Sequence, residues 1–407
     1  MFKKLQNIGP GPLVAAAFIG PGTITVCSLA GVRFGYSLLW ALAISIAATI
    51  VLQEMAARLG LISKAGLSEA IRSQLQHPFL KIITLFLIVS AIIIGNAAYE
   101  AGNVTGGVLG LETIVGSGQL KLGSQSYNYI SIIIGFMAFG LLYIGNYKFL
   151  ERILIALVIL MSLSFLITAV VTKPNMTAII KGIFIPNLNE ETVLDVAALI
   201  GTTVVPYNLF LHASLVNAKW KKGTDLKNVR FDTYIAIILG GVVSMMVIIT
   251  ATAISSGEIT NGADLAKSLE PLFGSYAKYV MGTGLFAAGL TSAITAPLAA
   301  AYVAAGCFGW SPNLRSNKLR AIWALVLVIG ILFSSLSISP IQVIWFAQIT
   351  NGLLLPIIAI FLLWIMNKKQ ILGTHTNTKF QNILGVLIVG FTIFLGAKSI
   401  LKVISQL

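Results

Sequence analysis

Two proline-containing motifs interrupt long apolar stretches of this 407-residue chain, and both contain residues that can bind a small ligand. Gly20-Pro21-Gly22-Thr23 interrupts residues 13–34, and Val205-Pro206-Tyr207-Asn208 interrupts residues 197–214. Proline removes a backbone donor and clashes with the preceding helical turn, and glycine lowers helix propensity. The backbone groups freed in this way need partners, so within a bilayer such a break must face protein or a water-filled cavity.

A single proline kink serves helix packing more often than binding. A matched pair of broken spans in the two halves of a chain is instead typical of a transporter's substrate site. Gln348 and Asn351 add polar candidates from within another apolar stretch. We therefore predict a substrate-binding site made of Gly20, Pro21, Gly22, Thr23, Thr203, Val205, Tyr207, Asn208, Gln348 and Asn351.

A second set of polar residues could carry protons. Glu100 is the only carboxylate that we place well inside a span, and it shares a helical face with Asn96 and Asn103. His212 follows the second break by one turn, and a histidine can titrate near neutrality. We predict a proton pathway that includes Glu100, His212 and Asn96. The alternative is that each of these side chains only forms hydrogen bonds to a neighbouring helix.

The composition requires elements that place these residues inside a membrane. Hydrophobic residues make up 57% of the chain and charged residues only 10%, which indicates a polytopic membrane protein. The net charge of +14 does not point to nucleic acid, because the basic residues lie in short loops between the spans and report topology. Cys27 and Cys307 indicate neither a disulfide framework nor a metal cluster, so we assign no metal ligands and no cofactor.

Apolar stretches of suitable length predict eleven membrane-spanning helices. They cover residues 13–34, 37–59, 80–109, 129–147, 153–172, 195–214, 233–254, 276–308, 321–336, 341–366 and 383–401. The first stretch lacks a small-residue cleavage site and is expected to be retained. Because most of the 27 lysines and arginines then fall on the inside, we expect a multi-pass protein of the plasma (inner) membrane with a cytoplasmic N-terminus and an external C-terminus.

The broken spans stand first and sixth, which predicts one transmembrane domain over residues 1–407 with an internal repeat. Five spans per repeat is an odd number, so the second repeat must be inverted in the membrane. We expect the first five-helix repeat at residues 12–172, the inverted second repeat at residues 192–366 and an extra helix at residues 381–402.

The motifs favour a secondary carrier over a channel or a membrane-embedded enzyme. We find no glycine-rich phosphate loop followed by lysine and no nucleophile–histidine–acid set. A channel would not need two matched broken helices. An intramembrane enzyme should show more than one ionisable group at membrane depth, so we expect no catalytic activity.

Several motifs resemble one family over nearly the whole chain. They are Ala56-Ala57-Arg58-Leu59-Gly60, residues 200–212, Gly289-Leu290-Thr291-Ser292, Gln348 and Pro356. In these residues the chain is similar to the Nramp family of divalent metal transporters. The resemblance implies an all-α membrane protein with a LeuT-like (APC superfamily) inverted repeat of five plus five transmembrane helices and an eleventh helix. It also implies alternating access, usually with protons as the coupling ion.

The binding motifs depart from that family. Its first break reads Asp-Pro-Gly-Asn, where this chain has Gly20 and Thr23, and its second reads Met-Pro-His, where this chain has Val205 and Tyr207. An aspartate of many members corresponds to Ala97, whereas the counterparts of Glu100, His212 and Gln348 are kept. The chain therefore lacks the carboxylate that compensates a bound cation and the thioether that selects softer metals.

Two substrate classes remain open at this point. The resemblance favours a divalent metal ion of the Mg²⁺ or Mn²⁺ class, held in a remodelled site through water. The local chemistry favours a small organic, amino-acid-like zwitterion, whose carboxylate would bind the exposed amides at a half-helix N-terminus. In either case the expected partners are the lipid bilayer, a small solute or ion and, as coupling ion, the proton.

Overall fold

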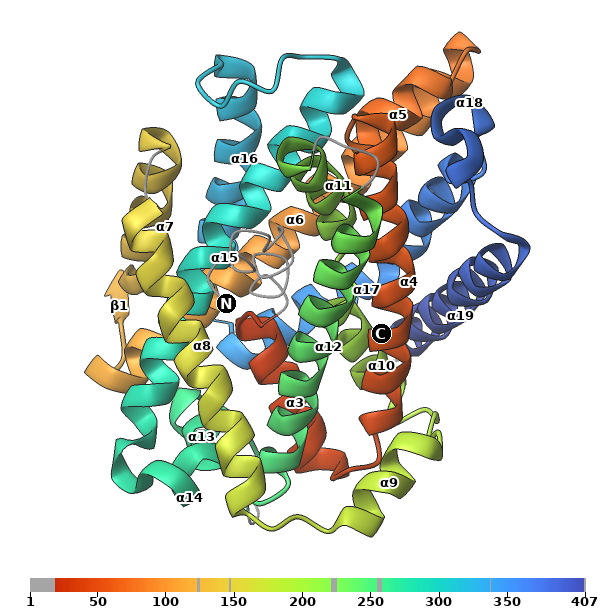
Figure 1. The fold of residues 1–407 in the computed structure, drawn as a ribbon. Coiled ribbons are helices and arrows are strands. Elements are labelled where there is room, and N and C mark those ends of the chain that lie inside the picture. The colour runs from red at the N-terminus through yellow and green to blue at the C-terminus, as the bar shows by residue number, and fades with distance from the viewer. Residues whose placement is uncertain are drawn as a thin grey trace.

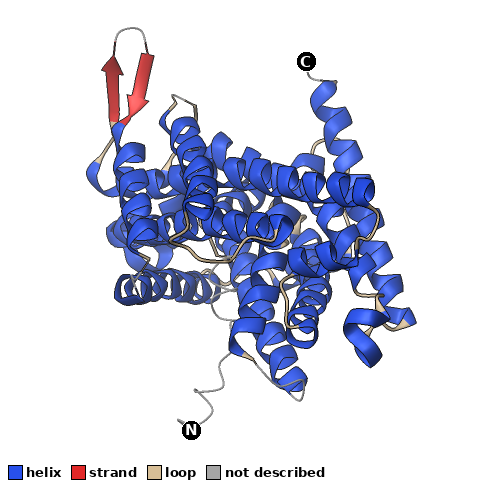
Figure 2. Ribbon diagram, turned by 90° about the horizontal axis from the view of Figure 1, so that it is seen from above, coloured by secondary structure: helices blue, strands red, loops and turns tan. Residues whose placement is uncertain are grey.

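The computed structural model describes residues 19–122, 125–145, 148–220, 225–254, 258–336 and 338–405. Helices dominate it, and the strands β1 (Gln119–Leu122) and β2 (Gln125–Asn128) form one antiparallel hairpin. Viewed from above, this hairpin and the C-terminal end of the chain project from well-separated places on the periphery (Figure 2). The start of the first predicted span, residues 13–18, lies outside the described residues.

Helices occur at all eleven predicted spans (Figure 1). They are α3 (Pro21–Phe34), α4 (Leu39–Ser63), α6 (Pro78–Val115), α7 (Tyr129–Ile144), α8 (Lys148–Val171), α10 (Val193–Thr203) with α11 (Pro206–Lys219), α12 (Leu226–Ala251), α15 (Ala277–Phe308), α16 (Asn317–Ser335), α17 (Pro340–Ile365) and α19 (Lys379–Ile404). Within the described residues, nine helical segments are long and apolar enough to cross a membrane, and α7 is shorter. The chain is an all-α membrane protein.

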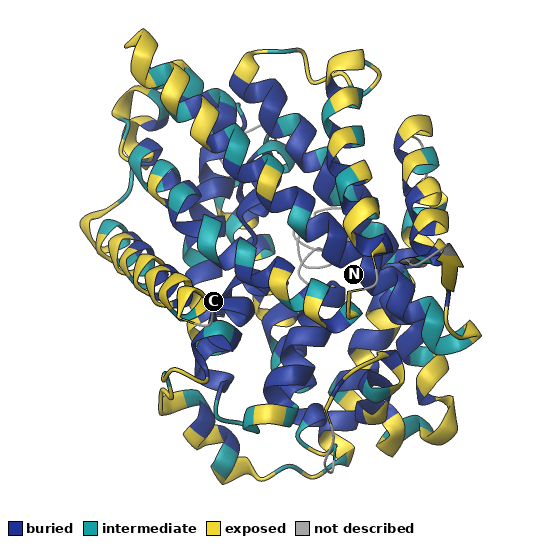
Figure 3. Ribbon diagram, turned by 180° about the vertical axis from the view of Figure 1, so that it is seen from behind, coloured by how far each residue is buried: buried dark blue, intermediate teal, exposed yellow. Residues whose placement is uncertain are grey.

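Short helices connect the spans. They are α5 (Leu67–Gln74), α9 (Met176–Phe184), α13 (Gly262–Ala266), α14 (Glu270–Phe273), α18 (Lys369–Leu372) and three 3₁₀ turns, η2 (Lys267–Leu269), η3 (Gly274–Tyr276) and η4 (Gly373–His375). Large apolar side chains such as Phe136, Phe149 and Leu401 are exposed on the outer helices, while the interior helices are buried (Figure 3). This distribution fits a surface that faces hydrocarbon.

Both breaks end earlier in the chain than predicted. Helix α3 begins at Pro21 with Gly20 as its N-cap, and α11 begins at Pro206 after the non-helical pair Val204-Val205. The prediction that Gly20–Thr23 and Val205–Tyr207 would be unwound was therefore wrong for the residues from each proline onward. Proline fits the first helical position, because its fixed φ suits a helix and its missing N–H would have no partner there.

Two close approaches hold the breaks in place. A Cβ at Gly106 of α6 would overlap the ring of Pro21, and a Cβ at Gly201 of α10 would overlap the backbone carbonyl of Gln348 in α17. Small residues allow helix backbones to approach closely inside a membrane, where packing rather than the hydrophobic effect joins helices. Gly106 therefore allows α6 to lie directly against the start of α3. Gly201 allows α17 to lie directly against the end of α10.

Candidate substrate site at the helix breaks

The two broken spans meet at their interruptions. The hydroxyl oxygens of Thr23 in α3 and Thr202 in the last turn of α10 lie 2.9 Å apart, and both residues are buried. On the other side of the second break, the ring of Tyr207 packs against Tyr99 of α6, with centroids 5.6 Å apart and planes tilted by 57°. The predicted residues Thr23 and Tyr207 thus each contact a residue outside the predicted set, Thr202 and Tyr99.

Helix α17 forms another wall of the site. The side chain of Gln348 occupies the space where a Cβ of Gly22 would stand, so α3 and α17 are in contact there. Asn351 lies almost one turn further along α17 and is buried, as Gln348 is. Both predicted residues of this helix are therefore interior polar groups, and Gln348 directly borders the first break.

Several polar atoms near the breaks have no hydrogen-bond partner within the described part of the chain. They are both side-chain polar atoms of Asn208, Oε1 of Gln348, Nδ2 of Asn351 and Oε1 of Glu100. Asn208 is in the first turn of α11 and is 1% exposed. Because buried polar groups are nearly always paired, such a group of unpaired atoms indicates a place for a ligand or for ordered water.

The electrostatic character of the site comes mainly from dipoles. The N-caps of α3 and α11, Gly20 and Val205, provide no side-chain hydrogen bond to the first turn. The last carbonyls of α10 face the second break, and they form the negative end of the α10 dipole. Glu100 directly follows Tyr99, whose ring packs against Tyr207 at the second break. The described residues contain no group of three or more histidine, cysteine, aspartate or glutamate side chains that could hold a metal.

The three predicted proton-pathway residues contact different helices. Asn96 donates to the carbonyl of Ala296 in α15 at 2.7 Å, so it also ties two helices together. Glu100 is fully buried, accepts from Asn103 Nδ2 at 3.3 Å and packs against Gly330 of α16. His212 lies one turn after Asn208 on α11, where its Nδ1 is 2.7 Å from Gln53 Oε1 and its Nε2 is 3.5 Å from Thr233 Oγ1.

Glu100 and His212 are connected only indirectly in the described structure. No hydrogen bond among the described residues joins them. Tyr99, which precedes Glu100, packs against Tyr207 in the first turn of α11, and His212 is one turn beyond Asn208 on that helix. A relay between the two would therefore have to run along the start of α11.

Sequence reasoning missed two residues of the site and misplaced one. Thr202 rather than Thr203 faces α3, because the Thr203 hydroxyl donates to the Leu199 carbonyl of its own helix at 2.8 Å. Tyr99 was also missed, although its position next to Glu100 was a signal. Val205 is buried as the N-cap of α11. Its backbone carbonyl accepts from the backbone N–H of Asn208 at 3.1 Å.

A charged cluster lies next to the Gln53–His212 contact. Glu54 accepts from Arg58 Nε at 3.0 Å and from Arg230 Nε at 2.8 Å, and Arg58 also donates to Asn377 Oδ1 at 2.8 Å. We refer to Glu54, Arg58 and Arg230 as the ion cluster. It ties α4 to α12 and to the connection that precedes α19.

Comparison with known proteins identifies relatives over the full chain. The sequence profile of the natural resistance-associated macrophage protein-like (Nramp) family matches residues 11–402. The divalent metal cation transporter MntH of Caldanaerobacter subterraneus is 25% identical over 405 residues, which cover 97% of this chain and 92% of the relative. MntH of Yersinia pestis is 26% identical over 403 residues, which cover 97% and 94%.

Solved structures agree with the fold. The manganese transporter of Eremococcus coleocola, solved with an aromatic bis-isothiourea substituted compound, matches with a TM-score of 0.74 at 22% identity and covers 98% of this chain and 86% of its own. MhsT in complex with L-phenylalanine matches with a TM-score of 0.62 at 15% identity and 98% coverage of both chains. The fold is therefore LeuT-like, an inverted repeat of five plus five helices with an eleventh helix.

Proposed function

Since this chain belongs to the Nramp family, we propose that it is a secondary transporter that carries a divalent metal cation across the membrane by alternating access. Its curated relatives are named divalent metal cation transporters, and they align over almost the entire chain. The LeuT-like fold with two interrupted helices supports this proposal, because transporters of this fold bind substrate near the bilayer midplane at the repeat interface.

The observation that carries this proposal is the buried, unpaired amide of Asn208 at the second break. Its oxygen, together with Gln348 Oε1, the threonine hydroxyls and the last carbonyls of α10, would form a set of neutral oxygen ligands. Hard divalent cations prefer oxygen ligands, and Mg²⁺ in particular keeps several of its waters. We therefore propose an Mg²⁺-class substrate that is held partly through water, because residues 20–23 and 205–208 of the two break motifs include no thioether and no carboxylate.

Coupling to protons is part of the proposal. Glu100 is buried, has one unpaired oxygen and follows Tyr99, whose ring packs against Tyr207 at the start of α11. Deprotonated Glu100 would compensate for part of the charge of an arriving cation, and the proton that it releases would leave when the helices rearrange. Asn96 and His212 would complete the pathway at the contacts with α15 and with α4 and α12.

The multi-pass chain is proposed to lie in the plasma (inner) membrane with its N-terminus cytoplasmic and its C-terminus external. The distribution of lysine and arginine supports this orientation. The two repeats are proposed at residues 12–172 and 192–366, with the extra helix at residues 381–402.

A small zwitterionic solute is the second candidate. The supporting observation is that the starts of α3 and α11, both without side-chain caps, adjoin the same side chain, Tyr99. A Cβ at Gly20 would be 3.7 Å from the Tyr99 hydroxyl, and the ring of Tyr207 packs against Tyr99. Exposed amides at helix N-termini attract a carboxylate. Such a substrate would bind at the same breaks, but the site would then prefer a negatively charged carboxylate instead of a cation.

A ligand screen in two steps separates these candidates. Purified protein is heated with magnesium, manganese or mixtures of amino acids, and any ligand that raises the melting temperature is then tested for uptake into liposomes. Stabilisation by magnesium, followed by saturable magnesium uptake, is the expected result, since a ligand of the folded state stabilises by mass action. Stabilisation and uptake of an amino acid, with no response to either metal, would contradict metal transport.

A further inference from the structure

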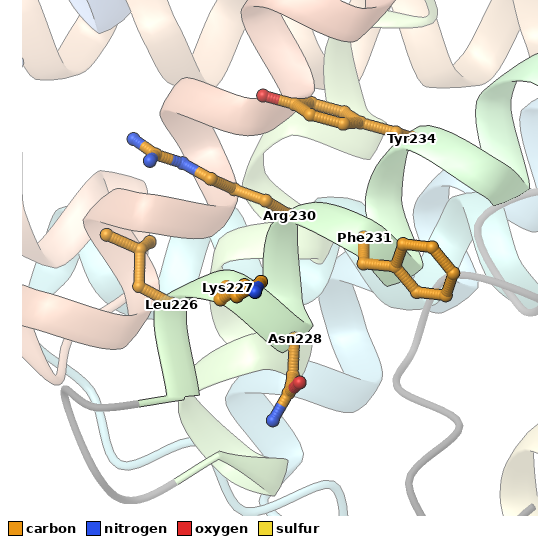
Figure 4. A pocket seen from close by; sticks show the side chains of 6 residues that line it. All are labelled: Leu226, Lys227, Asn228, Arg230, Phe231 and Tyr234. Atoms are coloured by element: carbon orange, nitrogen blue, oxygen red, sulfur yellow. The ribbon is translucent and has the colours of Figure 1, made fainter. Parts of the chain in front are cut away.

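We propose that the first turns of α12 hold the headgroup of an anionic phospholipid. A surface pocket of about 550 Å³ lies there (Figure 4). It is lined by Leu226, Lys227, Asn228, Arg230, Phe231 and Tyr234. Figure 4 shows the side chains of Arg230 and Tyr234 extending in one direction from the helix and the side chain of Phe231 extending in a different one.

The lining of this pocket is positively charged. Lys227 is exposed, and the side chain of Arg230 is 40% exposed. Arg230 shares its carboxylate partner, Glu54, with the buried Arg58, so one negative charge faces two guanidinium groups. The pocket-lining residues include two cations, Lys227 and Arg230, and no acid. Asp225 and Asp232 belong to the same end of the helix but do not line the pocket. An anion is therefore the matching charge.

An apolar stripe leads away from the pocket along α12. Its exposed side chains, Phe231, Tyr234, Ile235, Ile238 and Leu239, recur at helical spacing. The 26 residues of α12 span about 39 Å at 1.5 Å per residue, which exceeds the roughly 30 Å of the hydrocarbon core. One end of the helix must therefore reach the headgroup layer, and the cationic pocket lies at such an end.

This continuity decides in favour of a lipid over a soluble anion. The phosphate diester would lie beside Lys227 and Arg230, and an acyl chain would follow the apolar stripe into the hydrocarbon. Tyr234 and Phe231 stand where the two parts join, and aromatic rings favour this depth of the bilayer. Basic residues at a cytoplasmic membrane surface attract anionic lipids by about 1 kcal/mol each.

The test is a lipid titration of the full chain in detergent, followed by the melting temperature. Phosphatidylglycerol is expected to raise the melting temperature saturably, and Lys227→Gln is expected to weaken its apparent affinity about fivefold. Lys379→Gln is the matched control, since Lys379 is an exposed lysine at the first residue of α19, and it should bind the lipid as the wild type does. Arg230→Gln should also weaken binding, with its own lipid-free melting temperature as reference because Arg230 belongs to the ion cluster.

Three outcomes would overturn the proposal. Equal stabilisation by phosphatidylcholine would mean that only the apolar stripe binds. Equal stabilisation by inorganic phosphate alone would mean a soluble-anion site. Wild-type affinity of Lys227→Gln for phosphatidylglycerol would place the lipid elsewhere, whatever Arg230→Gln does.

Discussion

Two buried polar regions adjoin α11, and they differ in how completely their groups are paired. The ion cluster is charged, yet Glu54 receives both arginines and Arg58 has a further acceptor in Asn377. The helix breaks are nearly neutral, yet Asn208, Gln348 and Asn351 retain unpaired atoms. Full pairing is typical of a group that holds helices together, and unpaired groups are typical of a site that awaits a partner. The completeness of hydrogen-bond pairing therefore distinguishes a structural region from a functional one better than charge does.

The ion cluster should dominate stability. Arg58→Ala leaves the buried Glu54 with one partner, and breaking a buried ion pair costs about 3–5 kcal/mol of unfolding free energy. Thermal unfolding in detergent measures this. The control is Arg33→Ala, because the Arg33 side chain is 51% exposed and 3.8 Å from Asp195, and its loss should cost less than about 1 kcal/mol. Equal effects of the two substitutions would contradict a structural role for the cluster.

The contact between α10 and α17 should have the next largest effect on stability. Gly201→Ala places a methyl group against the backbone carbonyl of Gln348, and overpacking of this kind costs about 1–3 kcal/mol. The substitution should also abolish uptake, because it displaces Gln348 from the first break. Gly390→Ala is the control in α19, where a Cβ meets no atom within 4 Å and no loss of stability is expected. If Gly201→Ala transports normally, the close approach does not position the site.

These contacts also show what the sequence could and could not predict. Helix positions were predictable, because span length and hydropathy are local, and Pro21 and Pro206 located the breaks to within two residues. The choice of Thr202 over Thr203 was not predictable, because it depends on the rotation of α10 that Gly201 and Gln348 set by contact. Arg58 is one turn from Glu54 and could have been paired from its spacing. Arg230 is a partner from a distant helix, which spacing cannot reveal.

A substitution of Glu100 tests whether the unpaired carboxyl group near the breaks carries protons. Glu100→Gln keeps the shape and the hydrogen bond from Asn103 but cannot ionise, so it should change unfolding free energy by less than about 1 kcal/mol. Substrate-driven proton movement in liposomes should vanish while substrate binding persists. If Glu100→Gln moves protons with the wild-type pH dependence and His212→Ala does not, the proton carrier is His212.

Metal preference should show the smallest effect. Neutral oxygen ligands offer no thioether to favour softer metals, so calorimetry should give weak binding of manganese, within about tenfold of that of magnesium. Submicromolar manganese binding that survives Thr23→Ala and Tyr207→Ala together would mean that other residues hold the metal.

The central claim is that the unpaired groups at the breaks are the substrate site, and Asn208→Leu tests it most directly. Removing a buried amide that has no partner in the described structure should leave the melting temperature of ligand-free protein unchanged or raised. The same variant should lose the magnesium-induced rise in melting temperature, with Asn103→Leu in α6 as the comparison that removes a paired amide. The Asn208→Leu variant should therefore be stable and should no longer respond to magnesium. An Asn208→Leu variant that is destabilised and still responds as the wild type does would contradict it.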